Sequence, residues 1–427
     1  MILSRFLLVL SMFFIASGSF CQPRSPGNLV IVGGGLEADN RSVWEQLISF
    51  AGGVDKAAFA VIPSAGDAPV QSYMYFRNIL ISYGVNPGNI HLIPVAVKDD
   101  DSTRDVNESE WKNNGNDPRL AEIVRKCTAV WFTGGDQLRT MKALMAPDGS
   151  QTLVLKAVWD VYHSGGVIGG TSAGAAIMSE IMIGGGTSLA ALNHGVIRYY
   201  TGDDFPADTG VLITKGLGFF PYGIVDQHFN VRARFGRLAV ALMNEKQKGN
   251  LGFGIDENTA IIYNGRLNRM NIAGTSGVTI LDASEARISY VQNLPVIDNL
   301  TVSYLEEGDS YDFMTGIFTP AEGKQSTKGK EHYNNPYSGQ DGILYPVQTT
   351  FRDLITIHLS DNKVTDTIQK VTLLNPSSGF MVTIRKSPSS EGFYAGKPLP
   401  RDRYTVTHLK MDITPVHISI TPVTNKY

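Results

Sequence analysis

A serine between glycines stands where an apolar run meets a helix-like stretch. Residues 170–174 read G-T-S-A-G, with the apolar residues 167–168 before them and the helix-like residues 175–182 after them. Small flanking residues permit the sharp strand-to-helix turn that exposes a serine hydroxyl at a sheet edge. The amide of Ala173 then lies at a helix N-terminus, where it can donate to a developing oxyanion. The pattern predicts that Ser172 is a catalytic nucleophile.

A nucleophilic serine needs a base, and His228 is the histidine best placed to supply it. It closes the run 224–228 just past a short apolar strand, so it is also expected at a carboxyl end of the sheet. The base needs an acid that orients it and stabilises the imidazolium. Asp256 and Glu257 follow a later apolar strand, and Asp226 lies two residues before the histidine. Spacing alone does not choose among these three carboxylates.

Three arginines, Arg232, Arg234 and Arg237, follow the histidine. Their planar guanidinium groups suit carboxylates. The first two share one side of an extended chain, and the third lies at the start of the amphipathic stretch 236–244. Because a loop that feeds a helix can aim all three into one cleft, they are candidates to bind an acidic substrate. A solvated basic stretch is the alternative.

A second pair of glycines follows another predicted strand. Residues 133–137 read T-G-G-D-Q after the apolar run Ala129–Phe132. Paired glycines at a strand exit leave backbone amides uncovered, so Gly135 is a candidate for a second oxyanion donor. A tight turn before the helix that starts near Gln137 is the alternative.

The elements that must position these residues alternate between strands and helices. The predicted strands are continuous apolar runs, as expected of strands buried on both faces of a sheet: residues 29–32, 58–62, 90–95, 129–132 and 166–168. Candidate helices lie between them at residues 42–51, 71–83, 118–126 and 153–163. The alternation predicts an α/β fold with a doubly wound, mostly parallel sheet. Ligands bind at the carboxyl ends of such strands, where the motifs fall.

The second half of the chain is rich in short apolar runs separated by turn residues. The catalytic domain is predicted to cover residues 28–319, and its last strands are expected at 252–256, 260–263, 277–281, 288–290 and 301–305. Residues 320–345 are polar and rich in Gly, Lys, Asn and Ser, which is typical of a linker. Residues 346–427 are predicted to form a small β-sandwich-like module, with β-branched runs at 349–359, 365–374, 381–385, 404–409 and 416–420.

The composition is that of a globular protein. A chain of 427 residues is long enough for two domains. Its net charge is −3 and it has no basic run, so neither nucleic acid nor an anionic membrane is expected as a partner. No pair of histidines has metal-ligand spacing, so no metal and no cofactor are expected. Nothing in the sequence indicates the oligomeric state, and a homodimer is left open.

The first residues have the pattern of a targeting segment. A short basic start, an apolar run at 6–16 and small residues up to position 22 predict that residues 1–21 are a cleaved signal peptide. The apolar run is shorter than the ~20 residues that a membrane span needs, so no integral span is expected. The protein is therefore predicted to be secreted or periplasmic. A lipid anchor on Cys21 is less favoured, because a bulky phenylalanine precedes it.

Five separated motifs occur in the order found in cyanophycinases, which are peptidase E-like serine peptidases: residues 33–35, 133–137, 170–176, 226–229 with the three arginines, and 252–260. The chain resembles this family from residue 28 to about residue 319. The resemblance implies a flavodoxin-like or glutamine-amidotransferase-like domain and a triad of Ser172, His228 and Glu257. It further implies a substrate cleft lined by Gln137, Asp226, Gln227, Arg232, Arg234 and Arg237.

Cyanophycinases cut a polymer of aspartate that bears arginine on each side chain, and they release β-aspartyl-arginine dipeptides. The resemblance thus implies a substrate rich in aspartate and arginine and an acyl-enzyme on Ser172. The export signal and the C-terminal β module depart from the plain pattern of the family. They leave room for other aspartyl or β-aspartyl peptides, the substrates of a peptidase E-like exopeptidase.

Three other classes of protein share single features with this chain. Residues 33–38 fit the G-x-G-x-x-A turn of nucleotide-binding oxidoreductases, but no carboxylate ends the next predicted strand. Patatin-like acyl hydrolases carry the same G-T-S-A-G elbow, but their later D-G-[GA] is not matched by D-G-I at 341–343, inside the predicted linker. A non-catalytic secreted binding protein would not need the serine, histidine and glutamate together.

Overall fold

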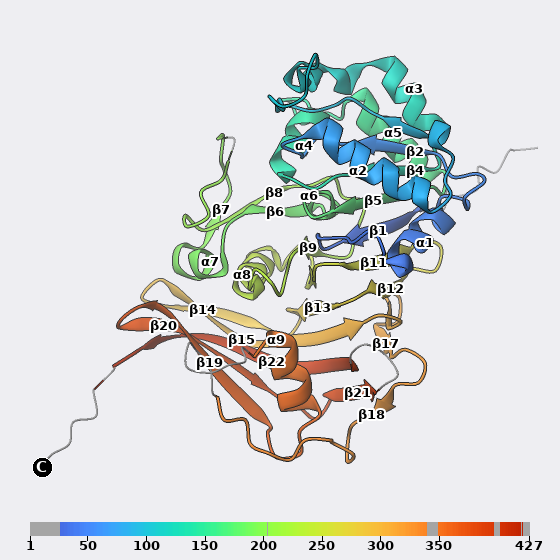
Figure 1. The fold of residues 1–427 in the computed structure, drawn as a ribbon. Helices are drawn as coiled ribbons and strands as arrows, with labels where there is room; N and C mark the ends of the chain where they lie inside the picture. Colours follow the sequence, from blue (N-terminus) through green and yellow to red (C-terminus); the bar gives the residue numbers. More distant parts are fainter. Residues whose placement is uncertain (1–25, 203, 340–348, 397–401, 420, 422–427) are drawn as a thin grey trace, which may run out of the picture.

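The computed structural model describes residues 26–202, 204–339, 349–396, 402–419 and 421. The predicted signal peptide and Cys21 lie outside these residues. Within them, no helix is both long and apolar enough to cross a membrane. Figure 1 shows two large sheets, with most of the helices around the upper one.

The first sheet contains the parallel strands that the alternating pattern predicts. β1, β5, β4, β2 and β3 are parallel neighbours, and the antiparallel strands β11, β12, β16 and β17 extend the sheet beyond β1. In sheet order the strands are β17 (Ile317–Thr319), β16 (Ser310–Asp312), β12 (Arg269–Gly274), β11 (Thr259–Asn264), β1 (Asn28–Val32), β5 (Val167–Thr171), β4 (Ala129–Phe132), β2 (Phe59–Ile62) and β3 (Ile90–Leu92).

Helices cover both faces of the parallel strands. Val30 and Val32 of β1 lie in one apolar core with α1 and α2, whereas Leu29 and Ile31 lie in another with α3 and α5. Successive residues of a buried strand must face opposite sides, which is why the run is apolar throughout. The doubly wound α/β fold is thus confirmed. The α-helices are α1 (Arg41–Phe50), α2 (Pro69–Ser82), α3 (Pro118–Lys126), α4 (Gln137–Leu144), α5 (Leu153–His163), α6 (Ala173–Ala176), α7 (Ser188–His194), α8 (Phe235–Glu245) and α9 (Phe351–Ile355), with 3-10 turns η1 (Pro87–Asn89) and η2 (Glu108–Asn116).

The second sheet joins the end of the predicted catalytic domain to the C-terminal region. Its central strand β15 pairs with β13 on one side and with the C-terminal β22 on the other. The β-rich C-terminal region is confirmed, and its strands continue a sheet of the catalytic part. The strands are β18 (Gln325–Ser326), β21 (Glu391–Ala395), β22 (Arg403–His417), β15 (Leu294–Glu306), β13 (Gly277–Asp282), β10 (Leu251–Ile255) and β9 (Ile224–Asp226), with β14 (Arg287–Val291), β19 (Thr367–Asn375) and β20 (Ser378–Arg385) beside them.

The start of the C-terminal region differs from its prediction as a strand. Residues 351–360 form α9 and a single π-helical turn, η3 (Thr356–Ser360). The Thr350 hydroxyl accepts a hydrogen bond from the Asp353 amide, and the Asp353 carboxylate accepts one from the Thr350 amide. This capping box stabilises a helix start and outweighs the β propensity of the threonines and isoleucines that follow.

The predicted linker is anchored where the structure describes it. Lys324 is buried, and its ammonium donates to both carboxylate oxygens of Asp309 at 2.8 Å and to the Tyr404 carbonyl at 2.9 Å. The start of this segment is therefore held against β22 and against the turn that follows β15 instead of running free. The division of the chain at residues 320–345 stays a prediction.

A small third sheet, β6-β8-β7, lies beside the two large ones. Its strands are β6 (Ile181–Gly185), β8 (Val211–Lys215) and β7 (Val196–Ile197). α7 and α8 lie between this sheet and the second large sheet (Figure 1), and their apolar residues share one core with β13, β15 and β22. Chain segments before and after α7, at residues 184–187 and 204–207, lie beside Ser172 at the carboxyl end of β5.

Candidate active site

Ser172 lies in a sharp turn between β5 and α6. Its backbone has φ +54° and ψ −110°, an unusual conformation for a residue with a side chain. A Cβ on Gly170 would lie 2.4 Å from the Gly174 carbonyl oxygen, and one on Gly174 would lie 2.4 Å from the Phe132 carbonyl oxygen. Both glycines are therefore required by close backbone approach, and the turn has the geometry of a nucleophile elbow.

His228 and Glu257 continue a line of hydrogen bonds from the serine. The Ser172 Oγ lies 2.8 Å from Nε2 of His228, and Nδ1 of His228 lies 2.5 Å from Oε1 of Glu257. With the Nδ1 proton donated to the carboxylate, Nε2 is the acceptor for the serine hydroxyl. The histidine follows β9 and the glutamate follows β10, which are parallel neighbours.

Burial keeps the histidine ready to accept a proton. The loss of hydration lowers the pKa of His228, while the hydrogen bond to Glu257 opposes that change. A pKa below the ordinary histidine value leaves the imidazole neutral at neutral pH. A neutral imidazole bonded to a hydroxyl is the arrangement that general-base catalysis needs.

The three candidate acids, which spacing did not separate, have different surroundings. Asp256 is buried and accepts hydrogen bonds from the Asn230 amide, the Ser276 hydroxyl, the Gly277 amide and the Tyr304 hydroxyl. Those bonds hold the loop that carries the histidine, and burial raises the pKa of Asp256. Asp226 is paired with an arginine instead. Among the three carboxylates, Glu257 is the one bonded to the histidine ring.

The glycine turn after β1 makes room for the base and its acid. A Cβ on Gly34 would lie 2.2 Å from Cε1 of His228, and the Gly33 carbonyl accepts a 2.6 Å hydrogen bond from the His228 amide. Nearby, the Asn258 side chain donates to the Glu37 carboxylate at 2.7 Å. The space that a pyrophosphate would need is filled by the chain's own residues, so the dinucleotide interpretation of this turn is wrong.

Gly34→Ala is therefore expected to displace the histidine ring and to lower kcat by about 100-fold, because a shift of roughly 1 Å at a catalytic group has that effect. Steady-state kinetics would measure the loss. Gly53→Ala is the matched control, since Gly53 also has positive φ, at +83°, but has open space at its Cβ. If both variants lose activity equally, the loss comes from backbone strain and the steric argument for Gly34 is contradicted.

A cavity of about 360 Å³ opens beside Ser172. It is lined by Gly135, Asp136, Gln137, Ser172, Gly184, Gly185, Gly186, Thr187, Asp204, Phe205, Ala207, Gln227, Arg232, Arg234 and Arg237. The motif at 133–137 supplies one wall, and the sequence singled out its Gly135 and Gln137. The wall from 184 to 207 was missed, because this segment carries no motif that spacing could reveal.

The two candidate oxyanion donors are available. In the described chain, the amides of Gly135 and Ala173 donate no hydrogen bond to another residue. Gly135 has φ +137°, and a Cβ there would lie 2.0 Å from the Ala65 carbonyl oxygen, so this strand exit needs glycine. Ala173 begins α6, where the helix has no internal acceptor for its amide.

Two of the predicted substrate-binding residues pair with each other. Arg237 and Asp226 are buried, and the guanidinium donates to both carboxylate oxygens, with Nε 2.8 Å from Oδ2. Nη1 of Arg237 also donates to the Gly186 carbonyl at 2.7 Å. Each charge is already paired with the other, and we interpret the pair as a brace of the cavity wall; their role in binding substrate stays a prediction. A buried fork pairing of this kind is strong once both partners are present.

The other two arginines, Arg232 and Arg234, can present a positive charge to a ligand in the cavity. Arg234 donates to the Gln227 carbonyl at 2.6 Å and lies 3.6 Å from Asp226, which already holds Arg237. Burial and the neighbouring Arg237 lower the pKa of Arg234 to about 9, so an added anion would stabilise its cationic form. Arg232 is exposed, and no hydrogen bond or ion pair joins its side chain to another described residue.

The two glutamines of the predicted cleft hold structure as well as lining the cavity. Nε2 of Gln137 donates to the carbonyls of Ile183 and Gly184 on β6, both at 2.9 Å. Oε1 of Gln227 lies 3.3 Å from the Ser172 hydroxyl and accepts a hydrogen bond from it as an alternative to the histidine. In the described chain no group of three His, Cys, Asp or Glu side chains could hold a metal ion.

Several known proteins have sequences similar to that of this chain. The sequence model of peptidase family S51 matches residues 29–270. A cyanophycinase of Geminocystis herdmanii is 32% identical over 295 residues, 67% of this chain and 93% of the relative. The cyanophycinases of Synechococcus elongatus, at 31% identity, and Trichormus variabilis, at 30%, match 67% and 70% of this chain and 80% and 90% of their own.

A solved peptidase structure from an acI-B1 actinobacterium aligns with 68% of this chain and 99% of its own, at 19% identity and a TM-score of 0.46. That similarity is too low to add to the assignment. The family match covers more than half of the chain, and it includes Ser172, His228 and the whole acidic turn with Glu257. The chain therefore belongs to peptidase family S51 and is a serine-type peptidase.

Proposed function

We propose that this peptidase hydrolyses cyanophycin, multi-L-arginyl-poly-L-aspartate, to β-aspartyl-arginine dipeptides, with Ser172, His228 and Glu257 as its catalytic residues. The observation that carries the proposal is the hydrogen-bonded line of these three side chains beside a cavity that holds available arginines. The relatives that cover two thirds of the chain are cyanophycinases, which supports the same substrate.

In the proposed mechanism the serine forms a covalent intermediate. As Oγ of Ser172 bonds to the carbonyl carbon of an aspartyl residue, His228 takes the hydroxyl proton at Nε2. The oxyanion is stabilised by the amides of Gly135 and Ala173. His228 then gives the proton to the departing amine, and the carbon–nitrogen bond breaks. Water, deprotonated by the same histidine, attacks the ester and releases the carboxylic acid, and the proton returns to the serine.

Charges on the cavity wall match both charges of the proposed substrate. Arg232 and Arg234 are placed to bind aspartate carboxylates. Asp226, a carboxylate expected in the cleft, is paired with Arg237, whereas two other carboxylates, Asp136 and Asp204, line the cavity. Asp204 makes a 3.4 Å contact with Arg139 but stays 82% exposed. We assign the guanidinium of the substrate to Asp136 and Asp204, since opposite charges on one ligand need opposite partners.

Substitution of Arg234 by Ala is expected to lower kcat/KM on cyanophycin by about one to two decades, because a charge-assisted hydrogen bond contributes roughly 1.5–3 kcal/mol. Arg232→Ala is expected to act in the same direction and less strongly, since Arg232 is exposed. Arg234→Lys should restore little, because lysine lacks the planar fork. Steady-state kinetics would measure these effects, with Arg287→Ala, at an exposed arginine of β14, as control. Equal rates for all the alanine variants would contradict the proposed binding of carboxylates by Arg232 and Arg234.

The N-terminal sequence supports a site of action outside the cytoplasm. We propose that residues 1–21 direct export and are removed, and that the enzyme degrades polymer released by other cells. Mass measurement of the mature N-terminus in a secreting host tests this. A chain that retains Met1 in the cytoplasmic fraction would contradict it.

Product analysis tests the substrate. The purified enzyme is incubated with cyanophycin and, separately, with aspartyl and β-aspartyl dipeptides, and the products are identified by mass spectrometry. β-Aspartyl-arginine from the polymer is the expected result. Cleavage of the dipeptides with the polymer left intact would instead identify a peptidase E-like exopeptidase. Ser172→Ala is the control for contaminating activity.

A further inference from the structure

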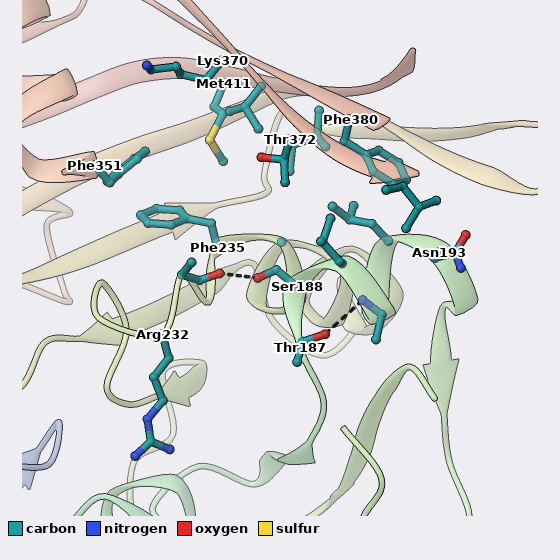
Figure 2. A pocket seen from close by; sticks show the side chains of 18 of the residues that line it. Thr187, Ser188, Asn193, Arg232, Phe235, Phe351, Lys370, Thr372, Phe380 and Met411 are labelled. Carbon is teal, nitrogen blue, oxygen red and sulfur yellow. Dashed lines mark hydrogen bonds between the residues drawn. The ribbon is translucent and has the colours of Figure 1, made fainter. Parts of the chain in front are cut away.

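A second cavity, of about 690 Å³, lies between the catalytic part and the C-terminal strands. One wall is formed by α7 and the start of α8, and the other by the facing sides of β19, β20 and β22 (Figure 2). Most of its lining is apolar and includes Leu192, Phe235, Phe351, Phe380, Met411 and Ile413, while the charged residues Asp208 and Lys370 also line it. Cavities of this size with a mostly apolar lining are typical of sites for small organic groups.

The alternation along β19 places one face of the strand on this cavity. Ile368, Thr372 and Leu374 line it, whereas Val371 and Leu373 point to the other face and are about half exposed, at 52% and 51%. At one end, the rings of Phe235 on α8 and Phe351 on α9 lie 3.7 Å apart between centroids and join the two walls. The wall formed by β19, β20 and β22 belongs entirely to the C-terminal region.

This apolar cavity adjoins the cavity at Ser172. Thr187 and Arg232 line both. Figure 2 shows the Arg232 side chain extending away from Phe235 and Phe351, so its backbone borders the apolar cavity while its guanidinium lies on the other side. The boundary is held in place by Ser188, whose hydroxyl donates to the Ala233 carbonyl at 2.6 Å. The two cavities are therefore neighbours that share a boundary formed by these residues.

We propose that the apolar cavity is a subsite for an apolar side chain of a peptide substrate whose aspartyl residue lies at Ser172. The inference rests on the proposed aspartyl hydrolysis. Cyanophycin contains only aspartate and arginine, whose charged groups would lose their hydration among these apolar residues. The cavity thus adds a second substrate class, aspartyl peptides with an aliphatic or aromatic residue near the aspartate. The bond broken and the acyl-enzyme are those already described.

Burial of one leucine or phenylalanine side chain sets the expected size of the preference. It corresponds to about 10- to 150-fold in kcat/KM over a serine at the same position. The preference is expected at one position of the peptide, because the fixed distance between the cavities selects one residue. Peptides identical except for serine, leucine or phenylalanine, placed one, two or three residues from the aspartate, would measure it.

Two tryptophan variants on one strand separate the subsite from the catalytic centre. Thr372→Trp fills the cavity and is expected to remove the preference while leaving the serine peptide and cyanophycin unchanged. Val371→Trp, on the opposite face, is the matched control and should keep the preference. Leu374→Trp repeats the test from a second lining position if Thr372→Trp melts at a lower temperature than the control.

The outcomes distinguish the two proposals. A preference for leucine and phenylalanine that Thr372→Trp or Leu374→Trp removes supports the subsite. Cleavage of cyanophycin and of all aspartyl peptides at equal rates, or a preference that survives in the filled variants, overturns the subsite alone. If wild-type enzyme cleaves neither cyanophycin nor any aspartyl peptide, while a fluorophosphonate still labels Ser172, the proposed substrate class itself has failed.

Discussion

Ser172→Ala is expected to lower kcat by about 10³-fold or more while the protein folds and binds substrate normally, because covalent catalysis is lost and the binding groups remain. Its hydroxyl is 2.8 Å from Nε2 of His228, and the turn that presents it is fixed by Gly170 and Gly174. Alanine retains the backbone and the Cβ, so the amide of Ala173 should keep its position.

Three measurements on this variant separate catalysis from folding. Steady-state kinetics gives the loss of kcat, thermal unfolding shows whether the fold is retained, and labelling with a fluorophosphonate reports the reactive hydroxyl. Ser284→Ala, at an exposed serine, is the control and should be labelled and active as wild type. A variant at position 172 that keeps wild-type turnover would remove the serine from the mechanism.

The elbow could be predicted from the sequence because its geometry is local. Gly170, Ser172 and Gly174 lie within five consecutive residues, and the strand and helix on either side are visible as an apolar run and a stretch of small residues. The parallel strands were predictable for a similar reason, since strands buried on both faces are apolar throughout. Their bounds in the structure differ by a few residues from those predicted.

Contacts between segments that are distant in the chain could not be predicted from the sequence. Gly34 and His228 are 194 residues apart in the sequence, yet they are in close contact in the structure. Neither local motif indicates this contact. Spacing also could not show that Asp226 and Arg237 neutralise each other, because that pairing needs the end of β9 to face the first turn of α8. Both residues therefore seemed free to bind substrate.

The C-terminal region begins with a local helix signal in its sequence. Thr350 and Asp353 form a capping box, a pattern that a sequence can reveal, yet the β-branched residues after it predicted a strand. By contrast, no local pattern could show that β22 would pair with β15, because the two strands are about a hundred residues apart in the chain. That pairing creates the wall of the apolar cavity.

Glu257→Gln is expected to lower kcat by about 10²- to 10⁴-fold with little change in thermal stability. The carboxylate accepts the Nδ1 proton of His228, and an amide in its place neither fixes the tautomer as firmly nor stabilises the imidazolium. Asp256→Asn should show the opposite signature, a lower melting temperature with a smaller change in kcat. Its carboxylate is buried and accepts several hydrogen bonds, and an unsatisfied buried group costs about 1–3 kcal/mol.

The pH dependence adds a measurement that a purely structural role for Glu257 would not change. The base must be neutral, so kcat/KM falls as pH drops through the pKa of His228, which burial holds below the ordinary value. The hydrogen bond to Glu257 raises that pKa, so its loss in Glu257→Gln should move the acidic limb to still lower pH. Profiles of kcat/KM for both enzymes on one substrate would measure the shift. An acidic limb that stays in place, or moves to higher pH, would show that Glu257 does not act on the histidine, and the role of the acid would then have to be sought elsewhere in the site.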